Sequence, residues 1–253
     1  MTSEDRDPDQ GSRSSRVRGK KRKQLPVWQE TILLFATALV LAIVLKAFFV
    51  QAFWIPSESM EPGLVEDDRI LVQKPSYWFG EPERGDVVVF EDAHNWLPAA
   101  EEPSGVTSVL AKIGLYPTGG HLVKRVIGVA GDTITCCDDE GRISVNGHPL
   151  DESEYAVVDE DECYGPMPDG TAYCDWEVGP VPDGHLFVMG DNRSHSADSS
   201  FHACFLTPAN RCEEEPYVDV DDVVGKVFVL LWPTDRFGFL HRPDAFDDVP
   251  DAP

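Results

Sequence analysis

Two serines stand one residue apart in a segment bounded by prolines, residues 55–63, which reads IPSESMEPG. Proline fixes the local backbone, and alternation along an extended segment puts Ser57 and Ser59 on the same side. A serine that acts as a nucleophile needs a rigid position, a base that takes its proton and donors for the developing oxyanion. Taken alone, the segment is weak evidence for catalysis, and a surface turn is the default interpretation.

Two lysines within apolar runs are candidate bases for such a serine. Lys124 lies in HLVKRVIGV and Lys226 lies in GKVFV. Strand alternation places Lys124 on one face with Leu122 and Val126, where burial lowers the pKa of the amine and favours its neutral form. A neutral lysine can act as a general base. The residues alone do not decide between Lys124 and Lys226, or exclude an edge-strand lysine whose amine reaches water.

A third segment, residues 190–200, reads GDNRSHSADSS and follows an apolar run. Its short polar side chains are suited to organising the backbone and orienting a nearby amine or hydroxyl. It lacks the glycine and the distal glutamate of the usual calcium loop, so a metal site is not expected. A structural turn is the simpler interpretation.

The elements that must position these residues are short strands. Six runs are rich in β-branched residues and bounded by Gly, Pro, Asp or Asn, which predicts a mainly β, antiparallel sandwich or barrel. The runs are residues 69–73, 86–90, 122–129, 142–145, 185–189 and 223–232. Residues 91–120 interrupt this series of strands. They are expected to form either a loop or a short amphipathic helix, and the helix, with Trp96 nearby, would rest on the membrane surface.

The apolar run at residues 31–50 contains a single charge and is long enough to cross a bilayer as a helix. Residues 1–26 hold eight Lys and Arg against four acids, which predicts a cytoplasmic N-terminus and an external remainder. A cleaved signal peptide is disfavoured by the length of the run and by the bulky residues after it. The predicted parts are a disordered tail (1–26), a transmembrane helix (27–50), an external β domain (51–135 and 183–243), an inserted subdomain (136–182) and a frayed acidic tail (244–253).

Charge and cysteine content narrow the class of protein further. The formal net charge is −24, and residues 51–253 hold forty acids against twelve Lys and Arg. Such a body repels phosphate backbones, so nucleic-acid binding is not expected. All six cysteines follow the apolar run, which agrees with an oxidising, external location, and their spacing matches no zinc site. They are Cys136, Cys137, Cys163, Cys174, Cys204 and Cys212; Cys163 with Cys174 and Cys204 with Cys212 are plausible pairs, but the sequence does not fix the connectivity.

Together these features resemble the bacterial type I signal peptidases, membrane-bound leader peptidases that use a serine–lysine dyad. Four motifs carry the resemblance, in the order of that family and behind a membrane anchor: residues 56–60, 84–90, 124–132 and 190–199. The likeness extends from about residue 25 to residue 241 and is loosest at 91–120 and 136–182. It implies a serine endopeptidase that removes N-terminal signal peptides and needs no cofactor and no metal.

The resemblance also implies roles for individual residues. Ser59 would be the nucleophile and Lys124, rather than Lys226, its general base, while the Ser59 N–H and the Ser57 hydroxyl would form the oxyanion hole. Ser196 would hydrogen-bond the Lys124 amine. Two further supporting residues, Asp198 and Arg125, would pair behind the site. One departure is Ser200, where the family commonly has an arginine that supports the aspartate.

Substrates and partners follow from the same resemblance. The substrates would be precursor proteins with Ala-x-Ala-type sites, bound as an added strand whose small side chains enter shallow pockets. The expected pocket walls are Phe53, Ile55, Met60, Leu64, Leu122 and Val123. The lipid bilayer would be a second partner, and the sequence leaves open whether the protein-translocation machinery is a third.

Two other functions remain as alternatives from the residues alone. A serine–histidine–aspartate hydrolase would use Ser59 with one of three histidines, His121, His195 or His202. The second alternative is a membrane-anchored β-rich domain that binds peptides or cell-wall components. In that case Ser59 and Lys124 would have no catalytic role. Substitution of Lys124 distinguishes the first alternative, and substitution of Ser59 distinguishes the second.

Overall fold

The structure is a computed structural model of the 253-residue chain. The chain divides into two units, Met1–Leu41 and Ala42–Pro253, and each is described by itself. The side chains of residues 44–47 are not described. The described residues are 26–78, 80–92, 96–97, 120–138, 142–157, 176–203 and 216–252. The predicted N-terminal tail up to residue 25, most of residues 91–120 and four of the six cysteines therefore lie outside the described residues.

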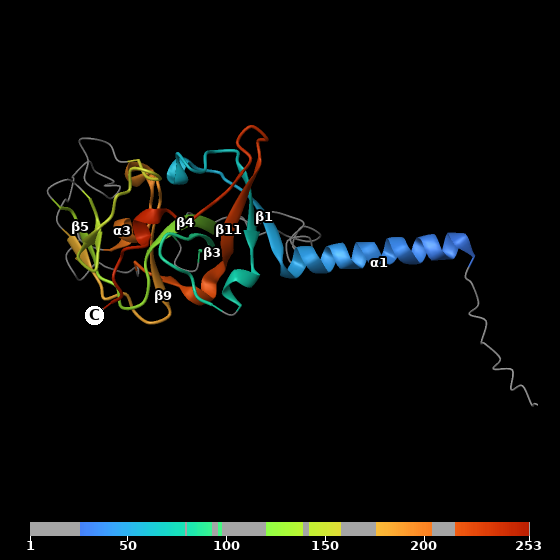
Figure 1. The fold of residues 1–253 in the computed structure, drawn as a ribbon, viewed down its shortest axis with the longest axis horizontal. Helices are drawn as coiled ribbons and strands as arrows, with labels where there is room; N and C mark the ends of the chain where they lie inside the picture. The colour runs from blue at the N-terminus through green and yellow to red at the C-terminus, as the bar shows by residue number, and fades with distance from the viewer. Residues whose placement is uncertain are drawn as a thin grey trace, which may run out of the picture. The chain divides into compact units, whose positions relative to one another are not determined.

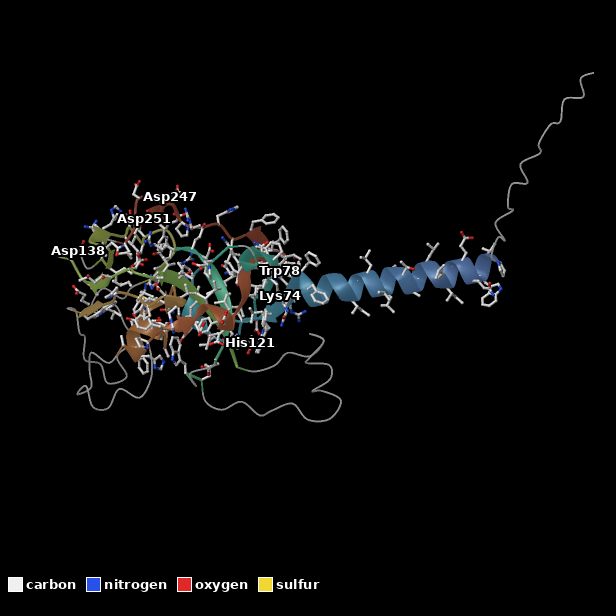
Figure 2. All side chains as sticks on the ribbon, turned by 90° about the horizontal axis from the view of Figure 1, so that it is seen from below. Lys74, Trp78, His121, Asp138, Asp247 and Asp251 are labelled. Atoms are coloured by element: carbon white, nitrogen blue, oxygen red, sulfur yellow. A yellow bond between two sulfur atoms is a disulfide. The ribbon has the colours of Figure 1, made fainter. Side chains whose placement is uncertain are left out.

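Helix α1 (Val27–Phe48) begins after Pro26, whose carbonyl accepts the backbone N–H groups of Gln29 at 2.8 Å and Glu30 at 3.2 Å. It contains neither glycine nor proline, and its many Ala and Leu residues favour the helix. Apolar side chains project on all its sides instead of forming one stripe (Figure 2). None of the helices in the described part of the chain combines the length and apolar character that a membrane crossing requires. A transmembrane role for residues 27–50 stays a prediction.

The main sheet of the second unit is antiparallel throughout, which confirms the predicted antiparallel β-rich domain. Its strand order is β1-β2-β11-β3-β4-β9-β10, with β12 paired to β11. The central strands β11, β3 and β4 are labelled in Figure 1. The bounds are β1 (Val50–Trp54), β2 (Arg69–Gln73), β3 (Val87–Glu91), β4 (His121–Gly128), β9 (His185–Met189), β10 (Val218–Asp219), β11 (Val223–Trp232) and β12 (Gly238–Phe239).

Both faces of this sheet are covered by apolar side chains. Along β3, Val87 and Val89 belong to one buried cluster, and Val88 and Phe90 belong to another. Alternate residues of a strand point to opposite faces, so a strand buried on both faces is apolar at every position. This explains why residues 87–90 form a continuous VVVF run.

A second sheet has the order β7-β6-β5-β8 and lies in the region where the sequence predicts an inserted subdomain. It does not have a core of its own. Ile134 of β5 and Val145 of β6 share one buried cluster with three residues of the main sheet, namely Ile127, Phe187 and Met189. The bounds are β5 (Ile134–Cys136), β6 (Ser144–Val145), β7 (His148–Pro149) and β8 (Trp176–Val178).

Short helical turns connect the strands, and two of them, η1 and η3, lie within motifs that the sequence singles out. The turns are η1 (Glu58–Met60), η2 (Pro75–Tyr77), η3 (Arg193–His195), α3 (Ser199–His202), η4 (Val220–Asp222) and η5 (Asp244–Phe246).

Trp96, one of the two described residues between 93 and 119, does not face outward as a membrane-resting segment would require. It is buried against Phe90, with ring centroids 6.0 Å apart, and stacks on His202 at 4.5 Å. Contacts with aromatic residues inside the domain therefore hold Trp96 in place.

Cys136 and Cys137 form a disulfide in the structure, a pairing that the sequence analysis did not predict. Cys163, Cys174, Cys204 and Cys212 lie outside the described residues, so the two plausible pairs among them remain predictions.

The C-terminal segment corrects one expectation, because residues 244–252 pack on the domain and are not a frayed tail. Phe246 and Val249 are buried in the cluster that joins the two sheets. Asn146 donates its side-chain amide to the carbonyl of Pro250 at 2.9 Å. Figure 2 shows Asp247 and Asp251 at the same end of the domain as Asp138. The expectation of a frayed tail rested on the acidic composition of the segment, but its two apolar residues Phe246 and Val249 anchor it.

We expect Phe246→Ala to lower the free energy of unfolding by about 3 to 5 kcal/mol, because it removes a buried ring and leaves a cavity. Urea denaturation followed by tryptophan fluorescence measures the change. Phe239→Ala is the matched control, since that ring is 63% exposed. Equal denaturation midpoints for the two variants would show that the C-terminal segment does not contribute to the core.

Candidate active site

The serine segment forms a turn whose two hydroxyl groups lie close together. Ser57 has an extended backbone and precedes η1, while Ser59 lies within η1 and is 8% exposed. The Ser57 Oγ and Ser59 Oγ atoms are 3.4 Å apart. The sequence analysis expected the two hydroxyls on one side of an extended segment. They do meet, but a 3-10 turn over residues 58–60 brings them together.

Lys124 reaches Ser59 from the middle of β4. It lies opposite Val88 in the sheet register and is 3% exposed, and its Nζ donates to Ser59 Oγ at 2.7 Å. Burial lowers the pKa of Lys124 to about 8, because the ammonium group loses its hydration; the carboxylates of Asp198 and Asp191 act in the opposite direction. A substantial fraction of this amine is therefore neutral near pH 8.

The loop after β9 holds the backbone of the serine turn. The N–H of Asn192 donates to the carbonyl of Ser59 at 3.1 Å, and the Asn192 side-chain amide donates to the carbonyl of Glu58 at 3.3 Å. Gly190 lies so close that a Cβ at this position would be 2.4 Å from the Ser59 carbonyl oxygen. Glycine is required there because no side chain fits between the two backbones.

Ser196 is next to the dyad, but its hydroxyl does not contact Lys124. Its Oγ is buried and has no hydrogen-bond partner among the described residues. The Ser196 Oγ lies close to Gly190: a Cβ added to this glycine would be only 2.3 Å from the oxygen. The expected hydrogen bond from Ser196 to the Lys124 amine is thus not formed in the structure.

Asp198 and Arg125 do not pair with each other, which corrects the pairing inferred from the resemblance. Arg125 donates twice to Asp191, Nε to Oδ1 at 2.8 Å and Nη2 to Oδ2 at 2.7 Å. Asp198 instead accepts the Gly190 N–H at 2.9 Å and both the N–H and hydroxyl of Ser200, at 3.0 and 2.7 Å. Ser200 therefore occupies the place of the expected arginine as a hydrogen-bond donor to Asp198.

Three buried residues that sequence analysis did not single out support this arrangement. Arg193 forms an ion pair with Glu152, and Tyr155 donates its hydroxyl to Glu152 at 2.7 Å. The guanidinium of Arg125 lies 4.4 Å from the centre of the Tyr155 ring. Arg193 is part of the GDNR motif, but Glu152 and Tyr155 fall in the loosest part of the resemblance and carry no sequence signal.

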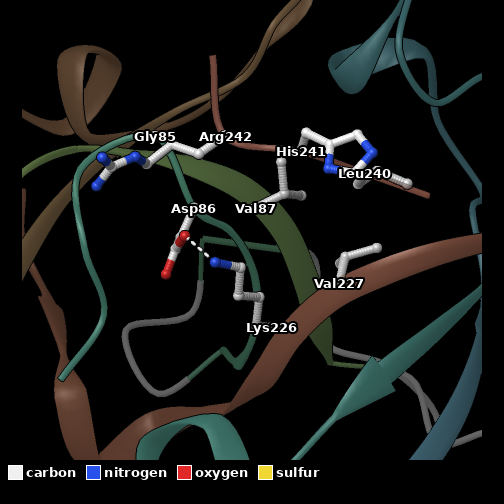
Figure 3. Close-up of a pocket in the computed structure, with 8 residues that line it drawn as sticks. All are labelled: Gly85, Asp86, Val87, Lys226, Val227, Leu240, His241 and Arg242. Atoms are coloured by element: carbon white, nitrogen blue, oxygen red, sulfur yellow. Dashed lines mark hydrogen bonds and ion pairs between the residues drawn. The ribbon is translucent and has the colours of Figure 1, made fainter. Parts of the chain in front are cut away.

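Lys226, the other candidate base, lies elsewhere and is already paired. Its amine forms an ion pair with Asp86, which also accepts the Tyr77 hydroxyl at 2.9 Å. Figure 3 shows Lys226 and Asp86 in a small pocket with His241 and Arg242. Ion pairing explains how this lysine is accommodated in an apolar strand.

None of the three candidate histidines contacts the serine. The hydrogen bonds of the Ser59 hydroxyl go to Lys124 and Ser57. His121 packs on Phe53 at 5.2 Å between ring centroids, and His195 Nδ1 lies 3.3 Å from Asn192 Oδ1. His202 stacks on Trp96. The geometry gives no support to a serine–histidine–aspartate arrangement.

Most of the expected pocket walls lie together beside the serine turn. Ile55, Met60 and Leu64 share a buried cluster, against which Phe53 and Val123 pack. Leu122 is the exception, since it belongs to the cluster on the opposite sheet face with Phe90. Among the described residues, no group of His, Cys, Asp or Glu side chains is arranged to hold a metal ion.

A β-rich domain that holds a serine hydroxyl against a buried lysine has the site of a candidate serine hydrolase. Comparison with known proteins identifies the family: the model described as "Signal peptidase, peptidase S26" matches residues 28–232. The chain therefore belongs to the signal peptidase family, peptidase S26, and is a peptidase.

Two relatives of known name agree with this assignment. The chain is 37% identical over 258 residues to signal peptidase I of Mycobacterium tuberculosis (strain ATCC 25618 / H37Rv), covering 92% of this chain and 84% of the relative. It is 37% identical over 239 residues to the probable signal peptidase I of Mycobacterium leprae (strain TN), covering 86% and 80%. A crystal structure of a signal peptidase I from Enterococcus faecalis V583 has 23% identity and a TM-score of 0.34, covering 58% of this chain and 96% of that chain.

The buried lysine makes a prediction about stability. The pKa of Lys124 is about 8 in the folded chain and 10.5 when exposed, so the unfolded chain binds more protons between these values. The cost of burying this group therefore falls, and the free energy of unfolding rises, as pH increases from 8 to 10.5. We expect the stability of the parent relative to Lys124→Met to increase by about 3 kcal/mol across that window.

Chemical denaturation of both proteins at pH 7.5, 9 and 10.5 measures this difference. The variant serves as the reference for all other groups that titrate in the same range. A stability difference that does not change with pH would mean that the Lys124 pKa is not lowered by folding.

Proposed function

We propose that this chain is a membrane-anchored serine endopeptidase that removes N-terminal signal peptides from translocated precursor proteins, with Ser59 as nucleophile and Lys124 as general base. Signal peptide removal follows from the family. The residue roles are supported chiefly by the 2.7 Å hydrogen bond between Lys124 Nζ and Ser59 Oγ, formed by a buried amine of lowered pKa.

The proposed reaction begins with neutral Lys124, which accepts the Ser59 hydroxyl proton as Oγ bonds to the scissile carbonyl carbon. The lysine then gives this proton to the leaving amine as the peptide bond breaks. A water molecule, deprotonated by the same amine, then attacks the resulting ester, and the lysine returns this proton to Ser59 Oγ as the ester bond breaks and the signal peptide is released. A bound substrate would exclude water from the site and favour the neutral amine further.

The oxyanion that forms in each step needs hydrogen-bond donors. The Ser59 backbone N–H and the Ser57 hydroxyl are the proposed donors, and the 3.4 Å separation of the two serine hydroxyls supports this assignment for Ser57. Ser196 is proposed to orient the Lys124 amine during the reaction, because its buried Oγ has no other partner among the described residues.

Arg125 and Asp198 are proposed to support the site separately. Arg125 occupies the Asp191 carboxylate with two hydrogen bonds, and Asp198 holds the Gly190 N–H. Each interaction fixes part of the loop whose Asn192 donates to the Ser59 carbonyl.

The proposed substrates are precursors with small residues at the first and third positions before the cut, as in Ala-x-Ala. The cluster of Ile55, Met60 and Leu64, with Phe53 and Val123 beside it, supports subsites of limited depth because these residues are packed against one another. Leu122 faces the other cluster, so it is the weakest of the proposed pocket walls.

The proposed anchor is α1, with a cytoplasmic N-terminus and an external catalytic domain. Support comes from the apolar run at residues 31–50 with its single charge, the exposure of apolar side chains along the helix and the basic residues that precede it in the sequence. The bilayer would then be a partner.

The catalytic proposal is tested by cleavage of a precursor with an Ala-x-Ala site. We expect Ser59→Ala and Lys124→Ala to lower kcat/KM by about a thousandfold or more, because each removes a reacting group. In the parent, kcat/KM should rise with pH through about 8, as Lys124 becomes neutral. Quantitative gel assays over a pH series measure both effects.

Lys226→Ala and His195→Ala are the controls, and both should cleave at nearly the parental rate. If Lys124→Ala retains activity while a histidine variant loses it, the dyad is wrong. If Ser59→Ala leaves the biological function intact, the chain acts as a non-catalytic binding domain.

The anchoring proposal is tested by alkaline extraction of membranes that contain the full chain. We expect the parent to stay with the lipid and Leu39→Glu with Val40→Glu to be released, because each charge at a helix centre costs about 3 kcal/mol. Leu39→Met with Val40→Leu is the matched apolar control. Activity on a soluble peptide shows that the catalytic domain is intact, and equal extraction of all three proteins would argue against the anchor.

A further inference from the structure

We propose that Arg236 is a positioning residue that sets substrate selectivity, because it holds the turn that carries Met60 and Leu64. The inference rests on the proposed function, in which these two residues line the substrate subsites. Arg236 lies outside the four sequence motifs, in the connection between β11 and β12, and nothing in the sequence links it to the serine segment.

The chain between Ile55 and Asp68 forms a closed loop on the edge of the main sheet. The N–H of Ile55 donates to the carbonyl of Asp68 at 2.9 Å, and the N–H of Asp67 donates to the carbonyl of Ile55 at 3.0 Å. Within the loop, the N–H of Leu64 donates to the carbonyl of Met60 at 2.9 Å. The ends of the loop are therefore fixed by β1 and β2.

The far part of the loop, residues 61–67, belongs to no strand, so side-chain contacts add to the few backbone hydrogen bonds that hold it in place. Asp68 provides one of them, since its Oδ2 accepts the Val65 N–H at 2.8 Å. Arg236 provides two, because its Nη2 donates to the Gly63 carbonyl at 3.0 Å and lies 3.1 Å from Asp68 Oδ2. One guanidinium group thus joins the middle of the loop to its end.

Arg236 is itself held by its hairpin. Its N–H donates to the Pro233 carbonyl at 3.1 Å, and Leu230 of β11 pairs with Ile70 of β2. Leu230 also belongs to the same buried cluster as Met60 and Leu64. The hairpin and the loop therefore pack on one core, and Arg236 connects them at the surface, where its side chain is 32% exposed.

Loss of this contact would affect the subsite more than the reacting groups. Asp68 is fully buried, and without Arg236 its carboxylate has no cation beside it, which favours movement of the loop toward water. Ser59 keeps its own supports, the Lys124 amine and the Asn192 N–H. A subsite with a loosened wall accepts larger side chains, because discrimination by size depends on a wall that does not yield.

The test compares cleavage of two full-length precursors that differ only in the residue before the cut, Ala or Val. We expect Arg236→Met to lower the Ala-to-Val ratio of kcat/KM by about tenfold, mainly through KM, with kcat on the Ala precursor within about threefold of the parent. Arg236→Lys should give an intermediate ratio, since its amine retains the charge opposite Asp68.

Arg242→Met is the matched control. Arg242 also lies late in the chain, its side chain is 35% exposed, and it forms ion pairs with Glu83 and Asp247 away from the serine loop. We expect the parental selectivity from this variant. Thermal unfolding of each protein shows whether it is folded, and if Arg236→Met is not, the comparison of Arg236→Lys with Arg242→Met decides.

Four outcomes would overturn the inference or its basis. In the first, the folded Arg236 variants keep the parental Ala-to-Val ratio while Leu64→Ala lowers that ratio. This result would reject Arg236 as a determinant of selectivity and retain the proposed subsite. An equal fall in kcat on both precursors would place the effect at Ser59 and also reject the inference. If neither Arg236→Met nor Leu64→Ala changes the ratio, the proposed subsite is wrong, and if the parent cleaves neither precursor, the proposed function is wrong.

Discussion

The contact between the Lys124 amine and the Ser59 hydroxyl depends on keeping a lysine away from water, and much of the domain serves this constraint. The ammonium form of a buried lysine is costly, so the pKa falls and the neutral amine becomes accessible near pH 8. Burial requires neighbours on every side, and β4 provides them because it lies between β3 and β9 in the main sheet. An edge strand would leave the amine in water.

The carboxylates near the lysine have to be prevented from pairing with it. An ion pair with Asp191 or Asp198 would stabilise the ammonium form and raise the pKa of Lys124. Arg125 donates two hydrogen bonds to the Asp191 carboxylate, and backbone N–H and hydroxyl groups donate to the Asp198 carboxylate. The chain has a large acidic surplus, yet its buried acids near the site have donors of their own. Most of the acids among the described residues are not buried, so water solvates their charges.

Elements that look separate in the sequence are joined by the core of the domain. The small sheet contributes Ile134 and the C-terminal segment contributes Phe246 to the same buried cluster as Phe187. Residues that reach the site come directly after β7 of the small sheet, since Glu152 and Tyr155 contact Arg193 and Arg125. A region with little sequence resemblance to the family is thus part of the support of the catalytic loop.

The amino-acid sequence by itself determined the β-rich fold class, the apolar helix, the candidate serine and two candidate lysines. Each of these depends on local patterns, namely residue type, alternation and spacing, which a sequence displays directly. The sequence did not determine the partners of buried charges: Arg125 pairs with Asp191 and not with Asp198, and Lys226 pairs with Asp86. Such pairs join residues far apart in the chain, so only the tertiary structure, which packs the strands in a particular order and register, decided which charges meet.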